Sequence, residues 1–421
     1  MSRSALGSVA AAALALTLFC AAAAARPSPA APLAGLRALA SPASAGSAEP
    51  HLAVGPDGMV WMSWLETRTQ GGHKLRGARL DGDRWGAPFT IAEGDSFFAN
   101  WADFPTMIAQ GGGRLVAHYL WKIGGETYAY EVRILQSADG GRTWSAPVVP
   151  HRDGTPTEHG FVSLWSAPGG TRAVWLDGRQ AVRDSAGHFL PVPEGTAEMT
   201  LRTTVLAGDG TLAEERVLDE RVCDCCQTAA VATTGGALVA YRDRDANEVR
   251  DIWLTRLENG RWSEPYPLHA DGWTIAGCPV NGPALAAAGD RVVAGWFTGA
   301  GDLSRVRVAF SRDGGRSFGA PTQVDGGAPL GRVHVLLLAD GDALVSWLEV
   351  KGKEALFQLR RVGAEGRAGP VMTAARTAAA RASGFPRIAR SGDRVILAWT
   401  EAGKPSQVRT ASARIAPPAG R

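Results

Sequence analysis

Short apolar stretches recur along the whole chain, each with a glycine-containing turn inside it and an aromatic residue near its end. Apolar and polar positions alternate within these stretches, which is the pattern of a half-buried β-strand, and a turn between two such strands predicts a β-hairpin. The hairpins fall at residues 54–66, 108–121, 166–177, 232–243, 286–298, 338–349 and 389–401. The pattern therefore indicates a chain built from an internal repeat.

A second hairpin follows most copies of the first. It combines a polar turn, an aromatic residue and then a proline, at residues 137–147, 311–321, 80–88 and 257–265. Each repeat then holds four short strands within about 50 to 65 residues, which is typical of a β-propeller blade. The sequence thus predicts an all-β propeller of four-stranded blades, seven by this count, with six as the alternative.

The last repeat, residues 384–415, shows only three strands, whereas residues 33–46 precede the first repeat and belong to no blade of their own. We expect this N-terminal segment to supply the missing outer strand, because a closed ring leaves no open sheet edge. A flexible linker is the alternative, since the segment is rich in alanine, proline and serine.

The first residues have the features of a secretory signal peptide, because Arg3 precedes a long apolar run and small residues follow up to Ala25. This predicts a periplasmic or secreted protein without a transmembrane anchor. Cys20 would leave with the signal, so four cysteines would remain in an oxidising compartment. The expected divisions are a signal peptide at 1–25, an N-terminal segment with the closing strand at 26–46, the propeller at 47–416 and a tail at 417–421.

The net charge of the chain limits the kinds of partner that the sequence predicts. The net charge is only +3, and no run of lysine and arginine or basic stripe with aromatic residues is present. These features argue against nucleic-acid binding. A small-molecule or glycan ligand is the expected partner, since propellers bind ligands at one end of the central channel.

Two turns carry a recognisable motif. Residues 137–144 read SADGGRTW and match the Asp-box pattern S-x-D-x-G-x-T-W, and residues 311–318 read SRDGGRSF, a close variant. The chain therefore resembles the sialidase-like (bacterial neuraminidase repeat, Asp-box) β-propeller superfamily over most of residues 47–415. The resemblance implies that the boxes have structural roles, on the face opposite the active site.

Polar residues gather at the other end of the predicted ring. They lie in the loops that lead into each inner strand and in the loops that join the second strand to the third. The first set of loops holds Asp103, Glu158, His159, Asn281, His334 and Arg387, and the second holds Asp177, Arg179, Arg242, Asp243, Arg244, Arg250 and Asp251.

The resemblance implies an exo-sialidase-type glycoside hydrolase as one hypothesis. Such an enzyme needs arginines for a substrate carboxylate, an acidic general acid and a Tyr–Glu nucleophile pair. The family's arginine motif is absent from the first blade, and Tyr128, Tyr130 and Glu131 lie near a strand edge, so no Tyr–Glu pair is assigned. The catalytic candidates are Asp103, Arg179, Arg242, Asp243, Arg250 and Arg387, and the ligand-binding candidates are Glu158, His159, Arg244, Asp251, Asn281 and His334.

The cysteines offer a second hypothesis. Cys223 and Cys225 are two positions apart, so on a strand their thiolates point to the same side and can share one metal ion. Cys226 or Cys278 would complete a soft site for copper or zinc, with His159 or His334 as further ligands. Two disulfides, or a redox-active pair, are the alternatives in an exported protein. A third hypothesis is a propeller that binds other proteins without catalysis.

Overall fold

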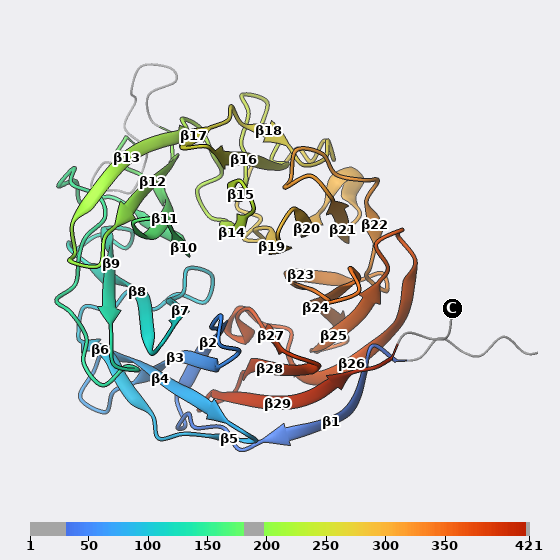
Figure 1. The fold of residues 1–421 in the computed structure, drawn as a ribbon, viewed down its shortest axis with the longest axis horizontal. Helices are drawn as coiled ribbons and strands as arrows, with labels where there is room; N and C mark the ends of the chain where they lie inside the picture. The colour runs from blue at the N-terminus through green and yellow to red at the C-terminus, as the bar shows by residue number, and fades with distance from the viewer. Residues whose placement is uncertain (1–30, 181–197, 418–421) are drawn as a thin grey trace, which may run out of the picture.

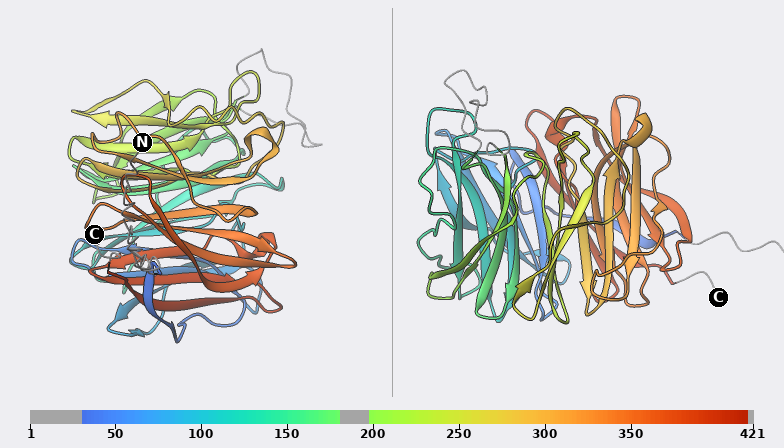
Figure 2. Two further views of the ribbon diagram at one scale, coloured as in Figure 1. Left: turned by 90° about the vertical axis from the view of Figure 1, so that its right-hand side faces the viewer. Right: turned by 90° about the horizontal axis from the view of Figure 1, so that it is seen from above.

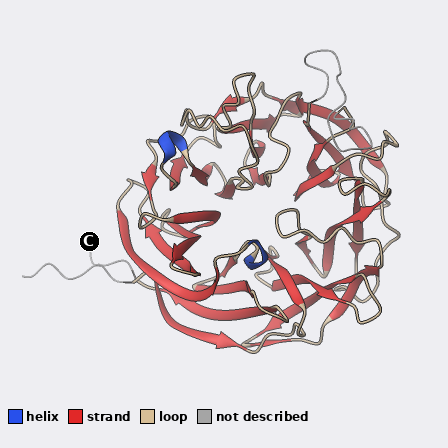
Figure 3. Ribbon diagram, turned by 180° about the vertical axis from the view of Figure 1, so that it is seen from behind, coloured by secondary structure: helices blue, strands red, loops and turns tan. Residues whose placement is uncertain are grey.

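The structure is a computed structural model that describes residues 31–180 and 198–417. Within these residues, seven antiparallel sheets stand around a central channel (Figure 1). The strands run along the axis of the ring (Figure 2), and two short helical turns, blue in Figure 3, lie in the loops. The prediction of an all-β, seven-bladed propeller is confirmed. The expected signal peptide, with Cys20, and residues 418–421 of the tail lie outside the described residues.

Each blade begins with its innermost strand. Blades 1 to 3 consist of β2 (Ser47–Val54), β3 (Val60–Thr67), β4 (His73–Asp81), β5 (Arg84–Trp85) and β6 (Phe89–Gly94); β7 (Thr106–Gly111), β8 (Arg114–Lys122) and β9 (Tyr130–Ser137); and β10 (His159–Ala167), β11 (Gly170–Asp177), β12 (Thr200–Leu206) and β13 (Leu212–Asp219).

Blades 4 to 6 follow the same order. They consist of β14 (Ala229–Thr233), β15 (Gly236–Arg242), β16 (Ile252–Glu258), β17 (Arg261–Trp262) and β18 (Tyr266–Pro267); β19 (Ala284–Ala288), β20 (Arg291–Thr298), β21 (Arg305–Ser311) and β22 (Thr322–Gln323); and β23 (Pro329–Leu337), β24 (Ala343–Lys351), β25 (Glu354–Val362) and β26 (Ala368–Ala378). The helical turns are η1 (Ala300–Asp302) and η2 (Arg381–Ser383). No helix in the described part of the chain has the length and apolar character needed to cross a membrane.

Blade 7 joins the two ends of the chain. It consists of β27 (Arg387–Ser391), β28 (Arg394–Glu401), β29 (Gln407–Ile415) and β1 (Leu33–Leu39). The N-terminal strand pairs antiparallel with β29, so that Leu33 lies opposite Ile415 and Leu39 opposite Thr410 (Figure 1). The expected closing strand is therefore present, and its two terminal leucines are buried.

Replacing Leu33 by alanine should lower the free energy of unfolding by about 2 kcal/mol, because the side chain is only 3% exposed and the change leaves a cavity between β1 and blade 6. Thermal or urea denaturation measures the loss. Arg37→Ala on the same strand is the matched control, since its exposed ion pair with Asp83 contributes little. An unchanged midpoint for Leu33→Ala would show that β1 does not stabilise the ring.

Buried tryptophans fill the space between neighbouring blades. In three of them the indole N–H donates to a carboxylate two residues further along the same strand, as in Trp347 to Glu349 at 2.7 Å. A buried indole needs such an acceptor, so a Trp-x-acid pattern lets the ring enter the core without an unsatisfied donor. The largest buried members, all on second strands, are Trp64, Trp175, Trp296 and Trp347.

The Asp-boxes form closed turns. Asp139 accepts hydrogen bonds from the backbone N–H of Thr143 at 2.9 Å and from its hydroxyl at 2.6 Å, and Asp313 bonds Ser317 in the same way. Gly141 takes φ +83°, which favours glycine. Because each box follows a third strand, it lies at the opposite end of the ring from the residues that begin the inner strands.

Candidate functional site

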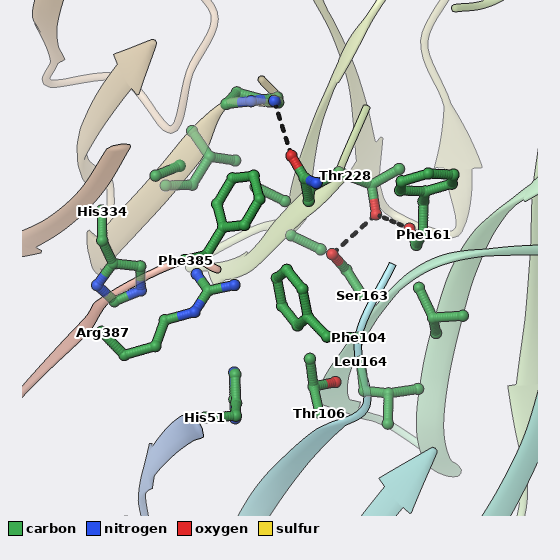
Figure 4. A pocket seen from close by; sticks show the side chains of 18 of the residues that line it. His51, Phe104, Thr106, Phe161, Ser163, Leu164, Thr228, His334, Phe385 and Arg387 are labelled. Carbon is green, nitrogen blue, oxygen red and sulfur yellow. Dashed lines mark hydrogen bonds between the residues drawn. The ribbon is translucent and has the colours of Figure 1, made fainter. Parts of the chain in front are cut away.

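One cavity, of about 160 Å³, lies in the central channel at the end where the inner strands begin. Its polar and aromatic side chains come from almost every blade or from the loop before it (Figure 4). They include His51, Asp103, Phe104, Thr106, Phe161, Ser163, Gln227, Thr228, His334, Phe385 and Arg387. Its position between the blades matches that of ligand sites in concave interiors.

A single position of the repeat faces this cavity in all seven blades. The second strand of each blade carries an aromatic residue, and the residue just before it pairs with one residue of the inner strand. In blade 1 the aromatic residue is Trp64, the residue before it is Ser63, and the inner-strand partner of Ser63 is His51. We call these residues the channel ring. They are His51, Thr106, Ser163, Ala229, Ala284, His334 and Arg387, and all of them line the cavity.

The channel ring has two unlike halves. Blades 6, 7, 1 and 2 supply two histidines, an arginine and a threonine, whereas blades 3 to 5 supply Ser163, Ala229 and Ala284. The large nitrogen-bearing side chains therefore stand on one side of the channel, and the small side chains leave free volume on the other. A ligand that enters the cavity therefore meets a positive charge and imidazole groups on one side, and the smaller hydroxyl and amide groups of Ser163, Thr228 and Gln227 on the other.

Backbone bulges interrupt three of the inner strands near their first residues. The pairing register shifts near the start of β2, β10 and β23, and in each shift a non-glycine residue has positive φ: Glu49 at +57°, Phe161 at +54° and Arg332 at +58°. Such conformations cost about 1 to 3 kcal/mol and collect at functional sites. The bulges lie just before His51, Ser163 and His334, so they set the direction in which these side chains point.

Arg387 is the cation of the cavity. Its guanidinium lies 4.7 Å from the ring centre of Phe104 and points toward the rings of Phe104 and Phe385, whereas His334 lies beside the stem of its side chain (Figure 4). Burial lowers its pKa to about 10, so it stays charged at neutral pH. Among the described residues no carboxylate pairs with it, and its Nε has no hydrogen-bond acceptor.

The histidines around Arg387 are neutral. Burial, followed by the charge of Arg387, lowers the pKa of His334 to about 3 and that of His51 well below its usual range. His118, on the second strand of blade 2, has a pKa lowered to about 3 by burial and shares a 2.9 Å hydrogen bond with Thr106. Neutral imidazoles beside a guanidinium leave the cavity with one positive charge and several N–H groups.

Asp103 is the acid of the cavity. One of its carboxylate oxygens accepts the backbone N–H of Phe161 at 2.8 Å, and the other lies 2.8 Å from the Tyr130 hydroxyl. Burial raises the pKa of Asp103 to about 7, although both hydrogen bonds act to lower it. The carboxyl group therefore exchanges a proton near neutral pH, which suits a general acid or base.

The Tyr130 hydroxyl links Asp103 to a second carboxylate, Glu158, also at 2.8 Å. A hydroxyl carries one proton and donates to one acceptor, so both contacts are hydrogen bonds only when one carboxyl is protonated and donates to the tyrosine oxygen. Burial and the charge of Asp103 also raise the pKa of Glu49 well above its usual range. The raised pKa values of Asp103 and Glu49 mean that these two carboxyl groups keep a proton to higher pH than exposed carboxyl groups do.

Three of the sequence-based candidates line the cavity: Asp103, His334 and Arg387. The other candidates lie outside the cavity lining. Arg179 pairs with Asp177, and Arg244 with Glu248. Arg242 and Asp243 are buried, and Arg250 bonds Glu248. Asp251 accepts hydrogen bonds from the backbone N–H groups of residues 272 and 273, and Asn281 bonds the backbone of residues 330 and 332. Glu158 and His159 lie at the start of blade 3.

His159 belongs to a separate cluster. Its ring stacks on His151 with 3.7 Å between ring centres, and both imidazoles approach Asp153 at 3.2 Å. Burial favours the neutral carboxyl of Asp153, but hydrogen bonds from His159 and Thr155 outweigh it and lower its pKa. His159 therefore belongs to a group separate from the cysteines, and it is not part of the cavity lining.

The four cysteines converge beside the channel. The Sγ atom of Cys223 lies 3.7 Å from those of Cys225 and Cys226, and Cys278 arrives from the loop before blade 5. Cys223 and Cys226 are buried, whereas Cys278 is exposed. The structure records no bond between any of these described thiols.

Two parts of the site were missed at the level of sequence. His51 is visible only when the repeats are aligned by strand register, because its position then matches those of His334 and Arg387. The Tyr130–Glu158 pair forms through a parallel bridge between residues 130 and 158 of neighbouring blades, for which the sequence carries no local signal. Tyr130 is fully buried under Phe98, so the pair lies behind the cavity wall.

Searches against protein-family models and curated proteins found no match. Among solved structures, the chain is similar to an ulvan lyase, a polysaccharide lyase, with TM-score 0.52 and 13% identity over 92% of this chain and 96% of that one. It also matches a mutant of the NanB sialidase from Streptococcus pneumoniae, with TM-score 0.46 and 9% identity over 85% and 83% of the two chains. A protein of unknown function from Dyadobacter fermentans matches with TM-score 0.49 and 15% identity over 93% and 100%.

At these identities the likeness concerns the fold. The structure shows this fold as seven blades, three-stranded in blade 2, in a ring that β1 closes. The chain is a seven-bladed β-propeller, and it is similar in fold to the ulvan lyase.

Proposed function

We propose that the channel cavity binds the anionic end group of a glycan, with a carboxylate held by Arg387. The observation that carries this proposal is an arginine that lines the cavity and has no anionic partner among the described residues. An enclosed charge without a partner is costly, and a planar guanidinium matches a carboxylate through two parallel hydrogen bonds. A ligand carboxylate therefore satisfies both the charge and the donors of Arg387.

The rest of the cavity suits a sugar. His51 and His334 offer neutral imidazole groups to hydroxyls, and Phe104 and Phe385 offer apolar faces beside the guanidinium (Figure 4). Ser163, Ala229 and Ala284 leave room on the opposite side of the channel ring. A volume of about 160 Å³ is below that of a drug-sized site, which favours one terminal sugar over an internal stretch of chain.

A glycan ligand also agrees with the ligand of one solved structure that has a similar fold. The ulvan lyase that shares the fold has been described bound to a GlcA(1-4)Rha3S repeat, whose GlcA unit is a uronic acid. The proposal extends this class of acidic ligand to the present chain on the strength of its own arginine.

Removing the charge of Arg387 should weaken binding of an acidic sugar by about 10- to 100-fold, because a hydrogen bond to a charged group contributes about 1.5 to 3 kcal/mol. Calorimetric titration of the wild type and Arg387→Gln with glucuronate and N-acetylneuraminate measures this, with glucose as the neutral probe. Arg390→Gln is the matched control, since Arg390 lies on the same strand outside the cavity lining. Equal affinity of Arg387→Gln and the wild type for both acids would contradict the proposal.

Hydrolysis of such a glycan is a second candidate function, which Asp103 favours because its pKa of about 7 suits proton transfer at neutral pH. Tyr130, enclosed behind the wall, orients Asp103 and is poorly placed to attack a substrate. Release of the fluorophore from a sialoside or glucuronide, abolished by Asp103→Asn, is the expected result for a hydrolase. No release from either substrate would end the hydrolase hypothesis and leave the binding proposal to the titration.

A further inference from the structure

The four cysteines have an arrangement that the glycan proposal leaves unused. Cys223, Cys225 and Cys226 place their Sγ atoms within 4.8 Å of one another, with two of the separations at 3.7 Å. The Sγ atom of Cys278 lies within 4.8 Å of that of Cys225. Two loops from neighbouring blades thus bring four thiols to one place.

The separations suit one central metal ion. A tetrahedral zinc–thiolate centre has metal–sulfur bonds of about 2.3 Å, which puts its sulfur atoms about 3.8 Å apart. Cys223 stands at nearly this distance from two partners at once. A disulfide, by contrast, joins sulfur atoms in pairs at about 2.05 Å, so it gives no reason for a third thiol to lie equally close.

Two arginines, Arg242 and Arg250, and one carboxylate, Asp224, lie around the cysteine loop. Arg250 donates to the Sγ atom of Cys223 at 3.3 Å, as a hydrogen-bond donor to a metal-bound thiolate does. Arg242 is 2% exposed, and its guanidinium donates to backbone carbonyls of residues 250, 281 and 297, with no carboxylate partner among the described residues. Its backbone carbonyl accepts the N–H of Cys223, so the two residues are neighbours at the backbone.

A metal bound by four thiolates explains this unpaired arginine. Four thiolates around Zn²⁺ carry a net charge of −2, and around Cu(I) a net charge of −3, so the centre is an anion that needs cations next to it. Arg250 pairs with Glu248 at 2.7 Å, an acid that it shares with Arg244, and lies 3.5 Å from Asp224, whereas Arg242 has no carboxylate partner among the described residues. The charge balance and the sulfur geometry are independent observations that agree.

We propose that Cys223, Cys225, Cys226 and Cys278 bind one soft d¹⁰ metal ion, Zn²⁺ or Cu(I), between blades 4 and 5. The three cysteines of one loop form the buried part of the site, and Cys278 closes it from the loop before β19. The site borders the cavity, because Gln227, next to Cys226, donates to the carbonyl of Ala102 and accepts the N–H of Gly282. The ion therefore fixes two loops that form the cavity wall.

The test uses the full chain, reduced and kept without oxygen. Zn²⁺ in one sample and Cu(I) in another are added and the excess removed, and elemental analysis then measures bound metal per chain. One ion per chain and four thiols that react with a thiol reagent only after a chelator is added are the expected results, and the sample that retains its ion identifies the metal. Replacement by Co²⁺ should give the intense thiolate-to-cobalt charge-transfer absorption of a tetrahedral site.

Variants separate metal binding from folding. Cys226→Ser should abolish binding, and Cys278→Ser, at an exposed position, should fold and bind the ion more weakly with the charge-transfer band reduced. Asp224→Asn is the matched control, because its carboxylate lies 3.9 Å from the Cys278 Sγ atom and is the competing ligand; it should bind as the wild type does. A folded, reduced wild type that retains neither ion, or whose cysteines form two disulfides and bind no metal after reduction, would overturn the proposal.

Discussion

Asp103→Asn is expected to make the protein more stable at pH 8, relative to the wild type, than at pH 5. Burial raises the pKa of Asp103 to about 7 in the folded chain, whereas an unfolded aspartate has a pKa of about 3.9. The folded chain therefore binds more protons than the unfolded chain between these two pH values. Its stability must fall as the pH rises through this window.

The size of the effect is large for one residue. Each unit of pKa shift corresponds to about 1.4 kcal/mol, so ionisation of Asp103 costs the folded state about 4 kcal/mol above pH 7 at most. Asparagine keeps an oxygen to accept the N–H of Phe161 but carries no charge, and its stability lacks this pH slope. Urea denaturation from pH 4 to 8 measures the difference between the two proteins.

Asp95→Asn supplies the control, since the Asp95 side chain is 80% exposed. Its stability should follow that of the wild type across the pH range. If the difference between Asp103→Asn and the wild type were the same at pH 5 and at pH 8, Asp103 would have an ordinary pKa and would lose its role as the acid of the cavity.

Trp347→Ala should lower the free energy of unfolding by about 3 to 5 kcal/mol, which is typical of a large aromatic removed from a core. Trp347 is fully buried between blades 5 and 6, where it packs with Val293, Val335 and Val362. The truncation leaves a cavity that this packing cannot close, and it also removes the indole N–H from Glu349.

Trp347→Phe separates the two contributions, because it keeps a six-membered ring in the core and removes the N–H that bonds Glu349. We expect it to cost about 1 to 2 kcal/mol, the effect of losing one hydrogen bond to a charged group and a little volume. Thermal denaturation of both variants gives the ratio. Equal losses for alanine and phenylalanine would show that the hydrogen bond, and not the packing, holds this blade.

The sequence predicts the fold well because the signals that specify it are local. Each hairpin is recognisable from alternating apolar and polar positions and from a glycine-containing turn. The incomplete last repeat indicates that another part of the chain supplies its fourth strand. Strand β1 fills this vacancy as expected, with Leu33 and Leu39 buried. The Asp-box turns also appear as the pattern requires.

The site is harder to predict, since its residues meet through the ring rather than along the chain. A prediction based on the loops selects Asp103, His334 and Arg387, which line the cavity. It also selects residues such as Arg179 and Arg244, which form ion pairs within their own loops. Strand register distinguishes His334 and Arg387, which belong to the channel ring, whereas Asp103 reaches the cavity from the loop before β7. A residue of the channel ring faces the cavity because of where it pairs, and this is readable only after the seven repeats are superimposed.

The closing strand also limits how the chain reaches its folded state. The partners in blade 7, residues 33–39 and 410–415, stand at the two extremes of the described chain. Contacts of such long sequence separation form late, after the intervening loop has been ordered. During synthesis the first six blades stand as an open arc until the last strand emerges, so truncation near residue 410 is expected to leave an unclosed, aggregation-prone intermediate rather than a shorter propeller.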